Sequence, residues 1–170
     1  MWKKADVRFF TIPSFVHAGG VVCAFSTRIG GVSPTPYDTL NFSRKREKNE
    51  EHFQENMRRF AVAAGFDYQN AVSDNYAHGS QVYRAEQKDA GFGIVKENLP
   101  DYCDGLFTDT EQLPIVSFHA DCVPLFFMIL CGAQWRFVTP AGGVRHSTLR
   151  KTRFSLCGRL DANRKIFWLQ

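Results

Sequence analysis

The stretch PIVSFHADCVPLFF, Pro114 to Phe127, is the most apolar run in the first three quarters of the chain. It is typical of a buried strand, Ile115 to Phe118, that stops at a tight corner and continues as a second apolar segment, Val123 to Phe127. At that corner Asp121 and Cys122 would project into a cleft, where a thiolate could bind a metal or act as a nucleophile. The alternative for Cys122 is a small buried apolar residue.

The composition indicates one globular domain. The chain has 170 residues, 44% of them hydrophobic and 16 of them Phe, which is enough to bury a core. The five cysteines show no paired spacing, so we expect reduced thiols and a cytoplasmic location. No apolar signal segment opens the sequence and no run reaches the length of a membrane span.

The positive charge lies entirely at one end of the chain. Residues 1–127 hold 13 Lys and Arg against 16 Asp and Glu, whereas residues 128–170 hold 8 against 1. A basic tail of this kind could bind nucleic acid by neutralising phosphates. Such a protein would lose a salt-sensitive affinity when residues 128–170 are deleted.

The order of elements predicts an α/β domain rich in short strands. We expect strands over 6–12, 20–27, 71–73, 81–85, 93–96 and 104–108. A helix is predicted from the cap at Asn49 to Ala64, with Gly65 just past its end. Its apolar residues form one stripe at helical period, which indicates core packing: Phe53, Met57, Phe60, Ala61 and Ala64.

The segment Arg28 to Asn41 contains two glycines and two prolines, so it is predicted to form turns. With Arg28 at its mouth and free backbone donors, this loop could hold a phosphate. A plain structural loop is the alternative, because no helix N-terminus or Walker pattern follows.

Two further segments hold possible site residues. His78 precedes a glycine and is a candidate ligand or an ordinary loop residue. Cys103 and Asp104 could belong to a site, although an aspartate before a strand is usually a turn cap.

Four motifs occur together in order: STRIGGVSPTPYDTLN (26–41), AHGSQV (77–82), DGLFTD (104–109) and HADCVPLFF (119–127). Over residues 6–127 the chain resembles the purine nucleoside phosphorylase family that is also called laccase-like, multicopper polyphenol oxidoreductase or peptidoglycan editing factor. The resemblance implies an α/β, layered mixed-sheet and helix sandwich, incomplete at its C-terminus. It also implies phosphorolysis of adenosine, inosine and methylthioadenosine to base and ribose 1-phosphate, together with adenosine deamination.

The resemblance implies a zinc site with three ligands. His78 and Cys122 match the first two, and the third is a histidine in a His-Ala-Gly-Trp-Arg-Gly motif that this chain lacks. A mixed His and Cys site with an open position suits a catalytic zinc. Asp121 is a candidate proton-transfer group or a cap of the corner, and Arg28 is the candidate phosphate ligand. Tyr76 departs from the family, which commonly has Gln there.

The missing motif fits a shifted reading frame. If each codon begins one base early, Val138-Thr139 permits His and Ala141-Gly142 permits Trp, with the rest of the motif in order. We therefore expect residues 1–127 to be the family domain and residues 128–170 to be an out-of-frame tail; a divergent but genuine C-terminus is the alternative. The chain then keeps two of three zinc ligands, and His119 and His146 are the available replacements.

Three other functions remain open at this stage. The chain could be a non-catalytic remnant of the enzyme, without zinc or turnover. It could be a copper-dependent polyphenol oxidoreductase, although three His and Cys positions are too few for a multicopper cluster. The basic tail could bind nucleic acid, but the resemblance favours purine nucleosides and phosphate as partners, with no nucleic acid and no membrane.

Overall fold

A computed structural model describes residues 7–76, 78–79, 81–120, 124 and 126 and, by their backbone alone, residues 127–131 and 134–140. Asp121, Cys122 and His146 lie outside the described residues. Within these ranges, no helix has both the length and the apolar character needed to cross a membrane.

The chain begins with a short antiparallel pair. Strand β1 (Phe9–Phe10) pairs with β2 (Phe25–Ser26), with Phe9 opposite Ser26. Between them lies α1 (Pro13–Ala18), a helix that the sequence did not reveal. Its proline occupies the first turn, where the missing N–H costs nothing, so the residue that normally breaks a helix begins one here.

The predicted helix is confirmed. After the short α2 (Arg44–Glu47), helix α3 (Glu50–Ala64) begins where Asn49 Oδ1 accepts the backbone N–H of His52 at 3.1 Å. It ends at Gly65, whose φ of 82° is the left-handed conformation that glycine adopts freely. The stripe of apolar residues faces inward, and Met57 and Phe60 are completely buried.

The centre of the fold is a parallel pair of very short strands. Strand β3 (Val72–Ser73) runs beside β6 (Ile115–Val116), with Val72 opposite Ile115. Their carboxyl ends therefore lie at one edge, the usual place for ligands in parallel sheets. The chain leaves this edge through Asp74 on one strand and Ser117 on the other.

A second sheet has the order β4-β5-β8-β7. Strands β4 (Val82–Ala85) and β5 (Gly105–Thr108) are parallel, whereas β8 (Gln134–Pro140) is antiparallel to both β5 and β7 (Phe127–Cys131). Two single 3₁₀ turns, η1 (Tyr68–Asn70) and η2 (Gln87–Asp89), complete the described elements.

One strand prediction was wrong. Residues 93–96, expected as a strand, form a turn in which Gly93 has a φ of 75° and its N–H bonds to the carbonyl of Glu97. Apolar character alone does not separate a buried turn from a strand.

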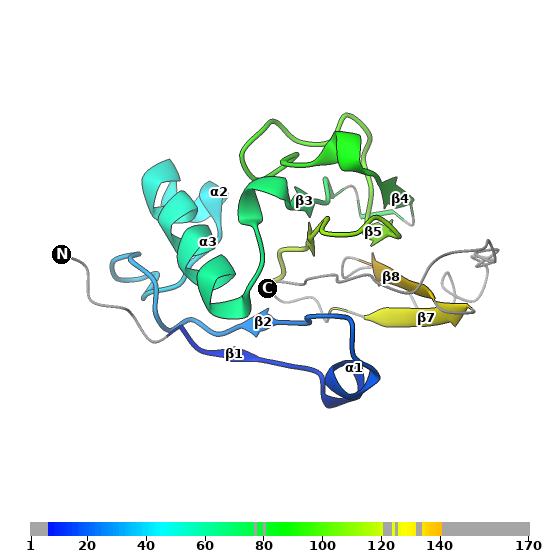
Figure 1. Ribbon diagram of the computed structural model, residues 1–170. Helices are drawn as coiled ribbons and strands as arrows, with labels where there is room; N and C mark the ends of the chain where they lie inside the picture. The colour runs from blue at the N-terminus through cyan, green and yellow to red at the C-terminus, as the bar shows by residue number, and fades with distance from the viewer. Residues whose placement is uncertain are drawn as a thin grey trace.

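The molecule is layered around the β3–β6 pair (Figure 1). Val72 and Ile115 belong to the core cluster beside the larger sheet, and Val116 belongs to the cluster beneath α3. Because neighbouring residues of a strand face opposite sides, the pair is covered on both faces. The predicted α/β layered arrangement of helix and mixed sheet is confirmed.

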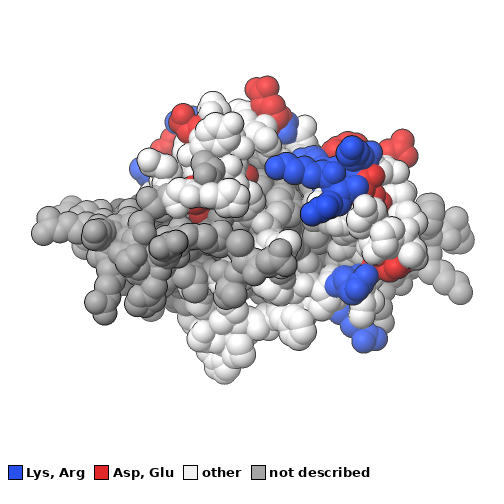
Figure 2. All heavy atoms as spheres, turned by 180° about the vertical axis from the view of Figure 1, so that it is seen from behind, with Lys and Arg blue, Asp and Glu red and all other residues white. Residues whose placement is uncertain are grey.

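Some of the basic side chains of the described residues pair with acids. Figure 2 shows blue Lys and Arg atoms with red acidic atoms beside them. Arg44 pairs with Glu50, Arg58 and Arg59 with Glu55, and Arg84 with Asp109.

Candidate functional site

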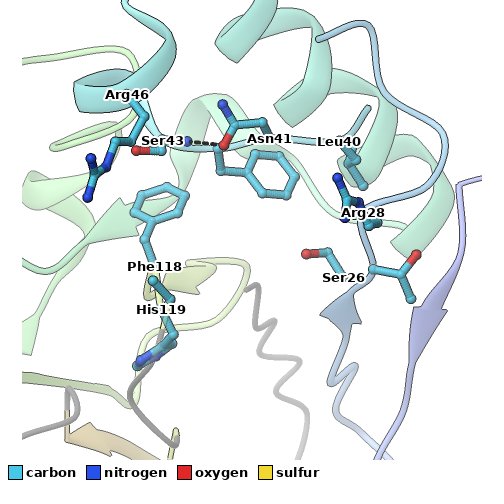
Figure 3. A pocket seen from close by; sticks show the side chains of 11 residues that line it. Ser26, Arg28, Leu40, Asn41, Ser43, Arg46, Phe118 and His119 are labelled. Atoms are coloured by element: carbon cyan, nitrogen blue, oxygen red, sulfur yellow. Dashed lines mark hydrogen bonds between the residues drawn. The ribbon is translucent and has the colours of Figure 1, made fainter. Parts of the chain in front are cut away.

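A cavity of about 570 Å³ opens between the end of β2 and the segment after β6. In Figure 3, Phe118 and His119 lie on one side of it, Ser26 and Arg28 on the other, and Asn41 between Arg46 and Leu40 above. The lining residues belong to two of the four motifs or lie near them in the sequence: Ser26, Thr27, Arg28, Leu40, Asn41, Phe42, Ser43, Arg46, Phe118, His119 and Ala120.

The loop of residues 28–41 contributes Arg28, Leu40 and Asn41 to one wall of this cavity. The N–H groups of Gly30 and Gly31 both donate to Thr39 Oγ1 at 3.1 Å, and Val32 donates to Asn56 Oδ1 at 2.8 Å. A Cβ on Gly31 would lie 2.0 Å from the carbonyl oxygen of Thr39, so the loop has no room there. These three backbone donors close the loop itself and are not available to a phosphate.

The positive charge of the cavity comes from two arginines. Arg28 Nε donates to the carbonyl of Asp38 at 2.7 Å, which fixes the side chain. The two terminal nitrogens of its guanidinium take no part in that bond. Arg46 lines the cavity from α2, and no Asp or Glu is among the lining residues. The cavity is therefore suited to an anion.

Asn41 holds the cavity wall together. Its Nδ2 donates to Glu47 at 2.7 Å, and its Oδ1 accepts the backbone N–H of Ser43 at 3.0 Å, the bond drawn in Figure 3. Glu47 also accepts from Ser33 Oγ at 2.7 Å. One carboxylate thus joins the loop to α2 and fixes the position of Arg46.

His119 lines the cavity. From the sequence alone, a position in the core or on the surface was expected for it. Its Nε2 is buried, and among the described residues it has no hydrogen-bond partner. Burial lowers the pKa of this imidazole, so it is held neutral at physiological pH. The ring meets Tyr76 edge-on with centroids 6.5 Å apart.

A second cavity, of about 310 Å³, lies beside the first and shares Phe42, Ser43 and Phe118 with it. Its other lining residues are Arg44, Lys45, Phe53, Ser73, Asp74, Asn75, Tyr76, Gly93 and Asn98. The two cavities thus adjoin at the carboxyl edge of the β3–β6 pair.

A buried hydrogen-bond chain crosses this edge. Asp74 Oδ2 lies 2.5 Å from Ser117 Oγ, which lies 3.0 Å from the Tyr76 hydroxyl, and that hydroxyl donates to the carbonyl of Phe118. Burial raises the pKa of Asp74 to about 7, although the serine bond opposes the shift. Burial also raises the pKa of Tyr76, so its phenol stays protonated.

His78 is exposed on a tightly fixed turn. Its φ is 56°, an uncommon conformation for a residue with a side chain. The next N–H, that of Gly79, donates to Asp104 Oδ2 at 2.8 Å. Asp104 is buried, and through this hydrogen bond it connects two segments that are distant in sequence.

The described residues do not complete a metal site. Among residues 7–76, 78–79 and 81–120, no three His, Cys, Asp or Glu side chains lie close enough to hold an ion. Cys103 is a buried free thiol, and burial raises its pKa to about 11. Of the two matched ligands only His78 is described.

Sequence reasoning missed several lining residues. Asn41 and Ser26 stand inside a quoted motif, but their types gave no sign of a cavity. Asp74 and Ser117 gave a weak signal, because each directly follows a strand and the carboxyl ends of parallel strands share an edge.

The fold and the paired cavities fit a known class. The family described as multi-copper polyphenol oxidoreductase laccase matches residues 22–136, and the chain belongs to this family. One relative is purine nucleoside phosphorylase LACC1 of Mus musculus, which is 32% identical over 73% of this chain and 27% of the relative. Another is purine nucleoside phosphorylase YlmD of Bacillus subtilis strain 168, which is 30% identical over 63% of this chain and 39% of the relative.

The crystal structure of YlmD from Geobacillus stearothermophilus matches 78% of this chain and 52% of that chain, with a TM-score of 0.66 at 25% identity. The chain therefore spans about half, or less, of the length of the relatives it matches.

Proposed function

We propose that this chain carries part of a purine nucleoside phosphorylase site, with phosphate bound in the larger cavity by Arg28. The observation that supports this most directly is a cavity of about 570 Å³ with two arginines and no carboxylate in its lining. The relatives named purine nucleoside phosphorylase supply the reaction class. The proposed substrates are adenosine, inosine and methylthioadenosine, each with phosphate.

In phosphorolysis a phosphate oxygen forms a bond to the anomeric carbon while the bond to the purine ring nitrogen breaks. The electron pair of that bond passes to the base, which takes up a proton, and the products are base and ribose 1-phosphate. In this proposal Arg28 attracts and orients the phosphate, because its guanidinium presents paired donors that match phosphate oxygens. Asn41 and Glu47 keep the cavity in shape around the anion.

We propose His78 and Cys122 as two of the three ligands of a zinc ion in the complete enzyme. Zinc would supply a Lewis acid and an activated water, which is the chemistry that adenosine deamination needs. Asp121 is the proposed proton-transfer group beside it. Because two ligands rarely hold a catalytic zinc, we infer that loss of the third impairs this chain. Copper is the less favoured metal.

Residues 128–170 are proposed to be read out of frame, with the family domain ending at residue 127. The boundary is a proposal in its own right, since the family match runs on to residue 136. On this view the basic tail binds no nucleic acid and no membrane, and the enzyme acts in the cytoplasm.

A non-catalytic remnant is the second candidate function. It is favoured by the absence of the His-Ala-Gly-Trp-Arg-Gly motif from the printed sequence. The remnant and the enzyme differ in one measurable property, which is turnover.

The experiment is to incubate the purified chain with inosine and phosphate and to measure hypoxanthine and ribose 1-phosphate. Phosphate binding is measured separately by phosphorus NMR line broadening, with Arg28→Gln as the test variant and Arg58→Gln as the control. Arg58 is paired with Glu55 on α3, outside the cavity lining. Equal phosphate binding by all three proteins would refute the phosphate site; binding without turnover would identify the remnant.

A further inference from the structure

One buried amide lies at the centre of the polar contacts behind the larger cavity. Asn56 belongs to α3 and is completely buried. Its Oδ1 accepts the backbone N–H of Val32 at 2.8 Å. Its Nδ2 donates to Ser33 Oγ at 2.9 Å and to the carbonyl of Asn41 at 2.8 Å. This one side chain therefore joins α3 to two separate parts of the loop of residues 28–41.

The partners of Asn56 fix the direction of each hydrogen bond. A backbone N–H can only donate and a carbonyl oxygen can only accept, so the contacts with Val32 and Asn41 allow one orientation of the amide. Because Asn56 donates to Ser33 Oγ, the hydroxyl proton of Ser33 is available, and Ser33 donates it to Glu47 Oε2 at 2.7 Å. A side chain at position 56 must therefore supply one acceptor and two donors, which an amide does.

The first connection runs from Asn56 to Arg46. Ser33 and Asn41, which both accept from Asn56, donate to the same oxygen of Glu47 at 2.7 Å. Glu47 is the last residue of α2 and directly follows Arg46, which lines the cavity. The place of Arg46 at the cavity therefore depends on the contacts that Asn56 makes.

The second connection runs from Asn56 through Ser33 to Arg28. The backbone N–H of Ser33 donates to the carbonyl of Thr39 at 2.9 Å, and the N–H of Thr39 donates to the carbonyl of Arg28 at 2.7 Å. Arg28 Nε in turn donates to the carbonyl of Asp38. The backbone and the side chain of Arg28 are thus both bonded to a segment that Asn56 holds through Ser33.

Helix α3 provides a rigid base for both connections. Met57, next to Asn56, and Phe60, one turn further on, are completely buried and belong to one core cluster. In Figure 3, Arg46 and Arg28 lie apart around the cavity, one on α2 and the other at the start of the loop. The spacing of the two arginines is therefore fixed from the same point on α3.

Building on the proposed phosphate site, we propose that Asn56 is a positioning residue of that site. Asn56 is not among the residues that line the cavity, so it acts through the loop and α2 and not on the phosphate itself. It holds Arg28 and Arg46 at the spacing at which both can act on one anion. Donors that are held in place before the ligand arrives lose little freedom on binding, which raises the affinity.

The test is the affinity of the whole chain for inorganic phosphate, measured by phosphorus NMR titration. Asn56→Leu keeps the branched shape and removes all three hydrogen bonds, so it should weaken phosphate binding by about tenfold or more. Met57→Ala, at the adjacent position, is the matched control. It removes buried packing from the same helix and should destabilise the fold, but the affinity of the folded protein should stay within about twofold of the wild type.

Two outcomes of this comparison would overturn the proposal. Unchanged affinity in Asn56→Leu would show that the amide does not position the arginines. Equal weakening in Asn56→Leu and Met57→Ala would show that position 56 matters through stability alone.

Ser33→Ala is a milder variant that keeps the test sharp if Asn56→Leu does not fold. Ser33 is 2% exposed, is not among the lining residues and carries the contact from Asn56 to Glu47. Loss of its hydroxyl should weaken phosphate binding by about threefold. In the double variant the loss should be smaller than the sum of the two single losses, because both act on one network. Wild-type affinity of Ser33→Ala, or additive losses, would contradict the network.

A second readout uses the wild type alone. If phosphate needs the closed network, phosphate at ten times its dissociation constant should slow hydrogen exchange of the Val32 amide, which bonds to Asn56, by about tenfold. The amide of Gly65, which bonds to the carbonyl of Ala61, is the control and should not change, because the end of a helix opens by local fraying. Exchange of Val32 that ignores phosphate would overturn the proposal.

These results separate the positioning role from the phosphorylase reaction. Phosphate binding that depends on Asn56 in a chain without turnover would keep the positioning role and refute catalysis. Turnover with phosphate affinity unchanged in Asn56→Leu would keep the enzyme and refute the positioning role. Absence of phosphate binding by the wild type would refute both the phosphate site and the role of Asn56.

Discussion

The backbone N–H of Gly79 donates to Oδ2 of Asp104 at 2.8 Å, which ties the turn that carries His78 to the residue directly before β5. Removing the Asp104 carboxylate leaves the Gly79 N–H without this acceptor, next to His78, the proposed metal ligand. We expect Asp104→Ala to lower the free energy of unfolding by about 1–3 kcal/mol. Urea denaturation measures this, and hydrogen exchange of the Gly79 amide should quicken. Unchanged exchange would show that the bond does not hold the turn.

Asp74 should make stability depend on pH. Its pKa is about 7 in the folded protein and about 4 in the unfolded chain, so between these values the folded state holds a proton that the unfolded state has released. The stabilisation is complete below pH 4 and is lost as the pH rises to 7, by at most about 4 kcal/mol. We expect Asp74→Asn to gain stability over the wild type between pH 5 and pH 8, as urea denaturation at each pH would show. A constant difference would mean that Asp74 does not titrate in this range.

Core packing beneath α3 should dominate stability. Met57 is fully buried on this helix, whereas Val62 is 67% exposed on its other face. Met57→Ala should cost about 2–5 kcal/mol through lost burial and the cavity left behind. Val62→Ala is the control and should change the unfolding free energy by less than about 0.5 kcal/mol. Similar losses for both would contradict the orientation of the helix.

The glycine loop should not accept a side chain at Gly31. A Cβ there would meet the Thr39 carbonyl at 2.0 Å and Asn56 Oδ1 at 2.5 Å, both part of the network that closes the loop. We expect Gly31→Ala to lower the melting temperature and to weaken phosphate binding, because Arg28 stands at the start of the same loop. Gly19 has a φ of 72° and no atom within 4 Å of an added Cβ, so Gly19→Ala tests backbone strain without crowding, whereas Gly31 has no positive φ and tests crowding. A melting temperature of Gly31→Ala equal to that of the wild type would contradict the crowding at the Thr39 carbonyl.

Restoring the reading frame should restore the metal site. Inserting one base at the codons of Phe126 and Phe127 should give a protein that binds zinc one to one and cleaves inosine with phosphate. The original chain should bind less than one equivalent, as measured by atomic absorption. Stoichiometric zinc in the original chain would refute the out-of-frame proposal.

The sequence predicted those elements that are stabilised by interactions between residues close together in the chain. Helix α3 followed from Asn49, Gly65 and a 3.6-residue apolar period, all of which act within one turn or along one face. The turn at Gly93 was mistaken for a strand because its bonds run to Glu97 and, through Arg44, to a helix far away in sequence. The family motifs led to Arg28 and His78, but the cavity lining depends on contacts that no motif encodes. Asp74 and Ser117 are 43 positions apart and meet only because β3 and β6 pair.

Phe118 is a wall common to both cavities, and its ring touches Phe42 and Phe53 with centroids 6.3 Å and 6.0 Å away. A ligand that turns this ring on one side changes the volume available on the other. The two cavities would then be energetically linked, and linkage is reciprocal: whatever factor a ligand in one cavity imposes on affinity in the other, the second ligand must impose on the first. The strength of that coupling would depend on the rotation of a single aromatic ring.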